Sequence, residues 1–174
     1  ETAHDSRAIG LAHFCLGQCY RKVGDLSIVR EHIAEAAAAL HAAGDRRYLA
    51  QVHSLSATTL AQSGRYEEAA AALRQAERLA TVIQADDVLA MVYGNQANVA
   101  LIRHRYDQAL ALAERAVALH DGIGEGPGLS RSLATLGQIC VRLGNLERAD
   151  TVLHRALDAR CAVQFHETTG AVYD

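Results

Sequence analysis

Apolar positions recur at a fixed interval along this chain. Val29, Ile33 and Ala36 are spaced i, i+4, i+7, and small or aliphatic residues return at this spacing forty, eighty and one hundred and twenty residues later. One position is alanine in all four copies: Ala36, Ala76, Ala116 and Ala156. This spacing follows one face of an α-helix, so each copy predicts a helix with a single apolar seam.

A second periodic segment precedes each of these helices and keeps the same register. Its aligned positions include Ile9, Leu49, Leu89 and Leu129, each followed by Gly10, Ala50, Ala90 or Ser130. The repeating unit is therefore predicted to be a helix pair, with turns near residues 24, 64, 104 and 144. The predicted repeats span residues 5–44, 45–84, 85–124 and 125–164 of one array.

The last residues of the chain align with the start of the preceding repeat. Residues 165–174 fall forty positions after residues 125–134, and they predict the start of a fifth repeat. Since a solenoid usually ends in an atypical, polar capping repeat, a chain that stops within a repeat is expected to be a fragment of a longer protein.

Helix starts are marked by aspartate and by the single proline. Asp5, Asp45 and Asp86 precede runs of helix-forming residues, and we expect them to act as N-caps. Pro127 is expected in the first turn of a helix, where its missing N–H costs nothing. No segment alternates with a period of two, so the predicted fold class is all-α.

The composition of the chain indicates which classes of partner and which cellular compartment to expect. The 174 residues are 50% hydrophobic and rich in alanine, which favours close helix packing over a wide core. A net charge of −3 removes the broad attraction on which nucleic-acid binding depends, so no direct nucleic-acid partner is expected. No apolar run approaches the roughly 20 residues that span a bilayer, and no signal-peptide pattern opens the given sequence. We expect a cytoplasmic protein that does not bind the membrane.

The cysteines and histidines do not form a recognisable catalytic or metal-binding motif. Cys15, Cys19, Cys140 and Cys161 allow two disulfides or a metal site, but small buried hydrophobes in a reducing compartment are the favoured interpretation. Among the nine histidines there is no H-E-x-x-H pair, and His13 and His53 share a repeat position with Tyr93 and Leu133, which indicates packing. No enzyme activity, cofactor or metal is predicted.

Several motifs resemble the tetratricopeptide repeat family over nearly the whole chain. The first copy matches the family signature through "LGQCY" (Leu16, Gly17, Tyr20), Gly24 and Ala36, and "GRYEEAAAAL" resembles the second-helix consensus. The period of forty exceeds the roughly 34 residues of the standard repeat. It is similar to extended variants in bacterial signalling and transcription regulators and in kinesin light chain-like adaptors. The departures from the family pattern are Val29, Ala57, Ala97 and His104.

This resemblance implies a right-handed α-solenoid whose concave groove is lined by the first helix of each pair. In register, one groove position reads Gln18, Thr58, Asn98 and Gln138, and Asn98 matches an asparagine that holds the ligand backbone in peptide-binding relatives. Amides donate and accept hydrogen bonds, so such a row suits an extended peptide. The full predicted groove contains Phe14, Gln18, Lys22, Gln51, Thr58, Gln62, Met91, Asn95, Asn98, Arg131, Gln138 and Arg142.

Two functions remain open from the sequence. The first is a protein-interaction module that binds an extended peptide or a helix of a partner in this groove. The second is an effector-sensing segment of a bacterial transcription or signalling regulator. A row of polar residues is equally compatible with a solvated helix face, and self-association through the terminal helices is a further expectation.

Overall fold

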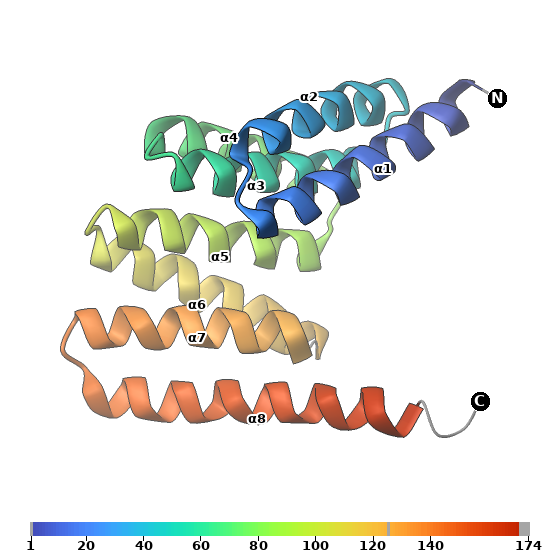
Figure 1. Cartoon of the computed structure of the whole chain (residues 1–174). Helices are drawn as coiled ribbons and strands as arrows, with labels where there is room; N and C mark the ends of the chain where they lie inside the picture. The colour runs from blue at the N-terminus through green and yellow to red at the C-terminus, as the bar shows by residue number, and fades with distance from the viewer. Residues whose placement is uncertain (1, 125, 171–174) are drawn as a thin grey trace. The chain divides into compact units, whose positions relative to one another are not determined.

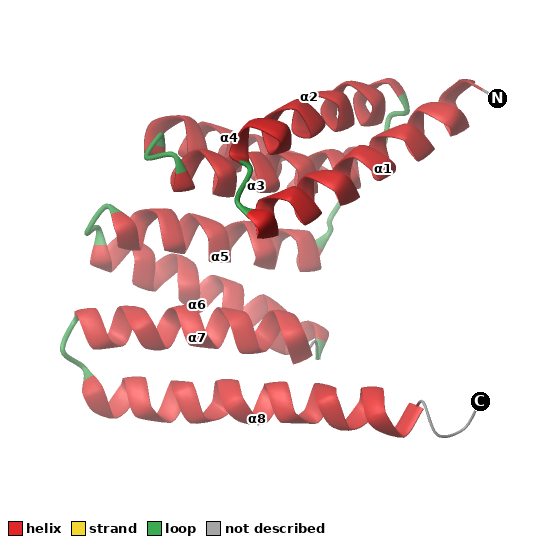
Figure 2. Cartoon of the chain, in the orientation of Figure 1, coloured by secondary structure: helices red, strands yellow, loops and turns green. Residues whose placement is uncertain are grey.

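The described part of the chain is entirely helical outside its turns (Figures 1 and 2). The structure is a computed structural model that describes the backbone of residues 2–124 and 126–170 and the side chains of residues 4–124 and 126–160. These residues form eight α-helices and no strand, which confirms the predicted fold class. The helices are α1 (Thr2–Val23), α2 (Leu26–Ala42), α3 (Arg46–Gln62), α4 (Tyr66–Val82), α5 (Asp86–Ile102), α6 (Tyr106–Ile123), α7 (Gly126–Arg142) and α8 (Leu146–Gly170).

The chain divides into two compact units, residues 1–88 and 89–174. In unit 1, α1 packs on α2, α2 on α3 and α3 on α4. In unit 2, α6 packs on α7 and α7 on α8. Each unit thus contains helix pairs joined by short turns, as the repeat predicts. That the two units form one continuous array stays a prediction.

Turns fall where the repeat places them. Gly24, Gly64 and Gly144 have φ angles of +91°, +75° and +76°, a left-handed conformation that costs glycine little. His104 occupies the equivalent turn with φ +57°. Histidine is one of the side chains that tolerate this region, so the third repeat reverses direction without the family glycine.

The helix N-termini were predicted with partial success. Asp45 caps α3 as predicted, because its Oδ1 accepts a hydrogen bond from the Tyr48 N–H at 3.0 Å. The N-cap roles of Asp5 and Asp86 were wrong: α1 already begins at Thr2, and Asp86 is itself the first residue of α5. Pro127 lies in the first turn of α7 as predicted.

One N-cap was missed by the sequence analysis. The carboxylate of Asp25 accepts hydrogen bonds from the Ser27 hydroxyl at 2.7 Å and from the Ser27 and Ile28 N–H groups. The Ser27 hydroxyl, followed by the Ile28 N–H, holds the pKa of Asp25 below its ordinary value. Asp25 therefore starts α2 by satisfying the free amide groups of its first turn.

The alanine seam forms the centre of the helix contacts. Ala36, Ala76 and Ala116 are fully buried and Ala156 is 6% exposed. Ala36 belongs to a unit 1 cluster with Phe14, Leu40, Val52 and Leu55, and Ala156 belongs to a larger unit 2 cluster that includes Leu133, Leu136 and Ile139. Small side chains at the seam let neighbouring helices approach closely.

Two expectations about the chain ends need correction. α8 continues as a helix to Gly170, so no turn separates it from a fifth-repeat helix starting at residue 165, and residues 171–174 lie outside the described residues. Cys140 is buried as expected, but Cys15 and Cys19 are exposed on α1, and the side chain of Cys161 is not among those described. In the described part of the chain α1 packs only on α2 and α3, which leaves the side of α1 carrying these cysteines uncovered.

Within the described residues, none of the helices offers a stretch that is both long and apolar enough to cross a membrane.

Candidate functional site

In unit 1, the predicted groove residues lie on α1 and α3. Gln18 and Lys22 on α1 are exposed, as is Gln62 at the end of α3, whereas Gln51 and Thr58 are half-buried. The Thr58 hydroxyl donates a hydrogen bond of 2.8 Å to the Leu55 carbonyl within its own helix. Its proton is therefore already engaged, and only the oxygen lone pairs of Thr58 are left for a ligand.

Phe14 does not belong to the exposed set. Only 7% of this residue is exposed, and it packs in the unit 1 core with Leu40 and Val52. Its ring meets the Tyr48 ring edge-on, with centroids 6.2 Å apart. Phe14 therefore supports α1 from inside, and the prediction that it lines a binding surface is wrong.

In unit 2, the predicted residues lie on α5 and α7. Met91, Asn95 and Asn98 are half-buried on α5. Ala97 and Ala100 of α5 share a core cluster with Leu136 and Ile139 of α7, so both helices contribute to one core in unit 2. The unit 2 residues of the predicted groove therefore come from two first helices that share one core.

The exposed side of α7 carries a narrow polar stripe, and Val141 on the same helix is also 48% exposed. Arg131, Gln138 and Arg142 are exposed at positions i, i+7 and i+11, which lie close to one line on a helix. Nine other residues of α7 are buried, from Gly128 to Cys140. Within the described residues, no hydrogen bond or ion pair is found for these three side chains or for Asn98. Their hydrogen-bonding groups are available to a ligand.

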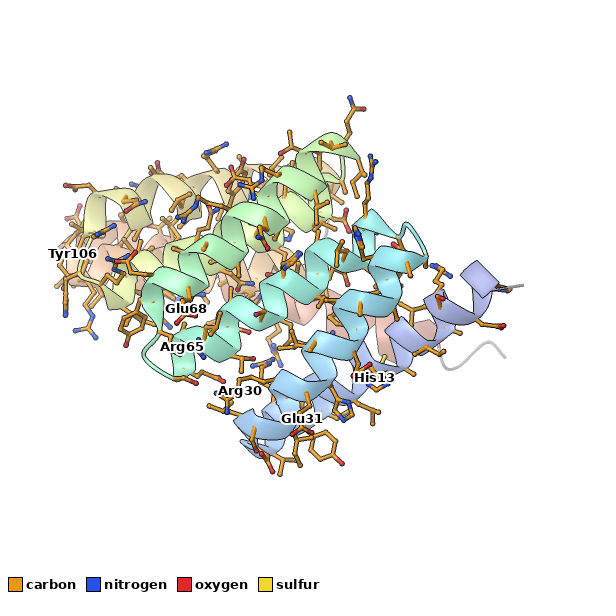
Figure 3. All side chains as sticks on the ribbon, turned by 90° about the horizontal axis from the view of Figure 1, so that it is seen from above. His13, Arg30, Glu31, Arg65, Glu68 and Tyr106 are labelled. Atoms are coloured by element: carbon orange, nitrogen blue, oxygen red, sulfur yellow. The ribbon has the colours of Figure 1, made fainter. Side chains whose placement is uncertain are left out.

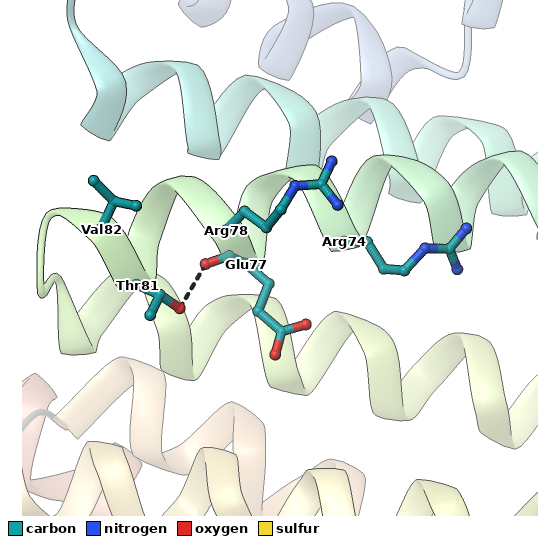
Figure 4. A pocket seen from close by; sticks show the side chains of 5 residues that line it. All are labelled: Arg74, Glu77, Arg78, Thr81 and Val82. Carbon is teal, nitrogen blue, oxygen red and sulfur yellow. Dashed lines mark hydrogen bonds between the residues drawn. The ribbon is translucent and has the colours of Figure 1, made fainter.

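A hollow that the sequence analysis missed lies on α4, the second helix of its pair (Figure 4). It is open, has a volume of about 500 Å³, and is lined by Arg74, Glu77, Arg78, Thr81 and Val82. The Thr81 hydroxyl donates to the Glu77 carbonyl at 2.8 Å. Two arginines one helical turn apart were the available signal, but such spacing is common on solvated helix faces.

Arg78 also acts on a histidine of the preceding helix. Burial lowers the pKa of His53 on α3, and the positive charge of Arg78 lowers it further. Both effects favour the neutral imidazole. This agrees with the sequence interpretation of His53 as a packing residue.

Charged side chains elsewhere form ion pairs, between helices or within one, rather than gather in a site. Arg148 of α8 binds Glu114 of α6 at 2.5 Å, and Arg155 pairs with Asp121 on the same two helices. At the start of α4, Arg65 pairs with Glu68 (Figure 3). Exposed ion pairs of this kind contribute little to stability, and they indicate a solvated surface.

Comparisons with known proteins agree with the helix-pair repeat. The tetratricopeptide repeat family matches through two of its models, one over residues 88–162 and one over residues 50–81. Together the matched segments cover more than half of the chain. A comparison with curated proteins found no match.

Two solved structures show the same fold. The crystal structure of BtubC (BKLC) from P. vanneervenii has a TM-score of 0.73 at 21% identity, covering 89% of this chain and 64% of that chain. A signal transduction ATPase with numerous domains and a tetratricopeptide repeat sensor, from Pyrococcus horikoshii, has a TM-score of 0.78 at 17% identity, covering 89% of this chain and 24% of that chain. This chain spans less than two thirds of the length of either protein. The matched family models and the repeated helix pairs together establish that the chain belongs to the tetratricopeptide repeat family.

Proposed function

We propose that the chain is a protein-interaction module that binds an extended peptide or a helix of a partner on its first helices. Tetratricopeptide repeats generally mediate protein–protein interaction, and proteins built from them are generally non-enzymatic scaffolds. The proposed surface consists of α1 and α3 in unit 1 and of α5 and α7 in unit 2. We call the two parts the unit 1 face and the unit 2 face.

The observation that carries the proposal is the polar stripe of α7. The polar stripe could consist of charged residues alone, yet it places Gln138 between two arginines, and Gln138 has no partner in the described residues. An amide can donate to a peptide carbonyl and accept from a peptide N–H, while the arginines can bind carboxylates. This combination suits a peptide with an extended backbone and an acidic side chain.

Asn98, which lies on α5, supports the same interpretation. It is half-buried on α5, so the Asn98 amide and the ligand group that binds it both lose contact with water when the ligand binds. Removing one partner of a buried hydrogen bond costs about 1 to 3 kcal/mol, because the remaining group is left unsatisfied. Asn98→Ala is therefore expected to weaken peptide binding about 5- to 150-fold.

The test compares two exposed glutamines of unit 2. Peptides selected from a random extended library on the purified chain would be labelled, and their affinity measured by fluorescence anisotropy for the parent, Asn98→Ala, Gln138→Ala and Gln108→Ala. Gln108 lies exposed on α6, outside the unit 2 face, and is the matched control for Gln138. Loss of binding in the α5 and α7 variants alone supports the proposal, and equal loss in Gln108→Ala overturns it.

A second candidate function is an effector-sensing segment of a signalling regulator. One observation favours it: the similar ATPase from Pyrococcus horikoshii is described as carrying a tetratricopeptide repeat sensor. A sensor of a compact effector would gain thermal stability from a small molecule, and the gain would survive Gln138→Ala. A thermal-shift screen of small metabolites and oligopeptides on the parent and this variant separates the two functions.

Self-association through the terminal helices stays a prediction. It is supported by Ile9, Leu16 and Val23, which lie seven residues apart on α1 and are 52%, 44% and 81% exposed. On α8, Leu157 is 61% exposed. Sedimentation of the parent and of Leu16→Glu tests the expectation, which fails if both sediment as monomers at every concentration.

A further inference from the structure

Two histidines face each other between α1 and α2. His13 reaches from α1 toward α2 (Figure 3), and its Nδ1 lies 3.0 Å from the Nδ1 of His32, so that one Nδ1–H donates a hydrogen bond to the other Nδ1 and a metal ion would take the place of this proton. The ring centroids are 5.1 Å apart, and the ring planes are inclined by 55°. Both residues are half-buried, so the pair is held between helices yet reachable from solvent.

Packing does not require histidine at these positions. In the other repeats the first position holds His53, Tyr93 or Leu133, and the second holds Ala72, Leu112 or Val152. An apolar partner therefore fills the second position in each of those three repeats. Only the first repeat places an imidazole at both positions. The other three helix pairs form without two histidines there.

The separation of the two nitrogens matches that of neighbouring ligands on a metal ion. Two metal–nitrogen bonds of about 2.0 to 2.1 Å that meet at about 90° hold their nitrogens about 2.8 to 3.0 Å apart. In a tetrahedral site the same bonds hold the nitrogens about 3.3 to 3.4 Å apart. The observed 3.0 Å thus fits adjacent positions of a square-planar or octahedral ion, the geometry that Ni²⁺ and Cu²⁺ prefer.

The surroundings favour a fixed orientation and an open coordination sphere. The ring of Tyr20 stacks on His32 with centroids 5.5 Å apart and an angle of 26°, which restricts rotation of this imidazole. Across the described residues, no group of three or more His, Cys, Asp or Glu side chains is arranged to hold a metal. Water would therefore complete the coordination, and the site would be of two ligands only.

We propose that His13 and His32 form a two-histidine site for a divalent transition-metal ion that ties α1 to α2. Imidazole nitrogen suits nickel, copper and zinc, and the right-angle geometry ranks Ni²⁺ and Cu²⁺ above Zn²⁺. Such an ion binds only the folded arrangement of the two helices, so it stabilises the fold in proportion to its occupancy. This inference concerns the contact between α1 and α2 and none of the residues predicted to bind a peptide, and it does not rest on the proposed function.

The test uses Ni²⁺ with the full chain, because Cu²⁺ would oxidise the exposed Cys15 and Cys19. Calorimetric titration would compare the parent with His13→Leu, His32→Leu and the control His41→Leu, whose histidine is exposed on α2. Leucine occupies the equivalent positions at Leu133 and Leu112, so the variants are expected to fold. We expect at least tenfold weaker binding in the two site variants and unchanged binding in His41→Leu, with Zn²⁺ binding the parent more weakly than Ni²⁺.

A second measurement does not depend on the variants. Substoichiometric Ni²⁺ should broaden the ring signals of His13 and His32 together in histidine ¹H–¹⁵N spectra of the parent, since both rings bind one ion, and Ni²⁺ whose octahedral coordination is completed by water is paramagnetic. Equal affinity in parent and site variants, or broadening of other histidines first, overturns the proposal.

Discussion

Two glycines inside helices of unit 2 offer a direct measurement of how tightly the repeats are packed. Gly94 lies in α5 and Gly137 in α7, and replacing either by alanine improves helix propensity by about 0.8 to 1.0 kcal/mol. The space around them differs. A Cβ on Gly94 would meet only the Ser132 Oγ, at 3.8 Å, whereas a Cβ on Gly137 would lie 2.6 Å from the Leu153 Cγ and Cδ2.

The two substitutions should therefore change stability in opposite directions. Gly94→Ala gains the higher helix propensity of alanine without a clash, so we expect the free energy of unfolding to rise by about 0.5 to 1 kcal/mol. Ala134 already occupies the equivalent position of α7. Gly137→Ala gains the same term but overpacks the contact with α8, which typically costs about 1 to 3 kcal/mol, so its net effect should be a loss of about 0 to 2 kcal/mol.

The clash can be isolated with a double-mutant cycle. In the third repeat, Ala97 and Ala113 take the positions of Gly137 and Leu153, so an alanine pair fits this contact. In a Leu153→Ala background, Gly137→Ala should become stabilising by about 0.8 to 1.0 kcal/mol. The coupling energy between the two positions should then be about 1 to 3 kcal/mol.

Urea unfolding followed by circular dichroism at 222 nm supplies the four free energies of the cycle. The m-values of the variants must agree with that of the parent, because a changed m-value would show that the unfolding transition itself had changed. A stabilisation by Gly137→Ala in the presence of Leu153, or a coupling energy near zero, would refute the close contact between α7 and α8.

Four further substitutions test other parts of the fold. Ala116→Leu should overpack the alanine seam and lower the urea midpoint by the equivalent of about 1 to 3 kcal/mol, and an unchanged midpoint would contradict the burial of this residue. Arg105→Asp should stabilise α6 by about 0.5 to 2 kcal/mol in thermal unfolding, because Arg105 occupies the N-cap without a side-chain hydrogen bond. Gln84→Gly should raise the thermal midpoint by the equivalent of at most about 1 kcal/mol, since φ +53° strains the glutamine while glycine loses more entropy on folding. Burial would raise the pKa of Asp45, but hydrogen bonds from the Tyr48 N–H and from Arg7 outweigh it and hold that pKa below its ordinary value. Its contribution is therefore present above a pH of about 4 and is lost as the pH falls through the lowered pKa, so Asp45→Asn should reduce the acid sensitivity of unfolding measured from pH 5 to 2.

The repeat could be predicted because each helix pair restates the same local signals. A seam of small residues at 3.6-residue spacing and a glycine at the turn act within a few residues of one another, so they are visible in the sequence. The end of the repeat was harder to predict. The turn position occupied by Gly44 and Gly124 is Gln164 in the last repeat, and α8 passes through it as a helix. At Gln84, by contrast, the chain does turn.

Exposure could be predicted less well than helix position. Cys19 aligns with Thr59 and Ile139, which are 1% and 0% exposed, yet Cys19 is exposed. Thr59 and Ile139 lie on helices that follow a packed second helix, α2 or α6, whereas α1 follows none in the described residues. Burial therefore depends on what stacks against a helix, and the helix's own sequence does not contain that information.

The same limit explains the error about Phe14. Repeat register aligns equivalent helices of successive repeats, and it correctly grouped His13 with His53, Tyr93 and Leu133. Register says nothing about which residues of α1 meet which residues of α2, because that depends on the rotation of each helix about its own axis. This rotation turns Phe14 into the core and brings His13 against His32, at 3.0 Å. A difference of one residue, about 100° around the helix, thus separates a packing residue from one that can bind a metal ion.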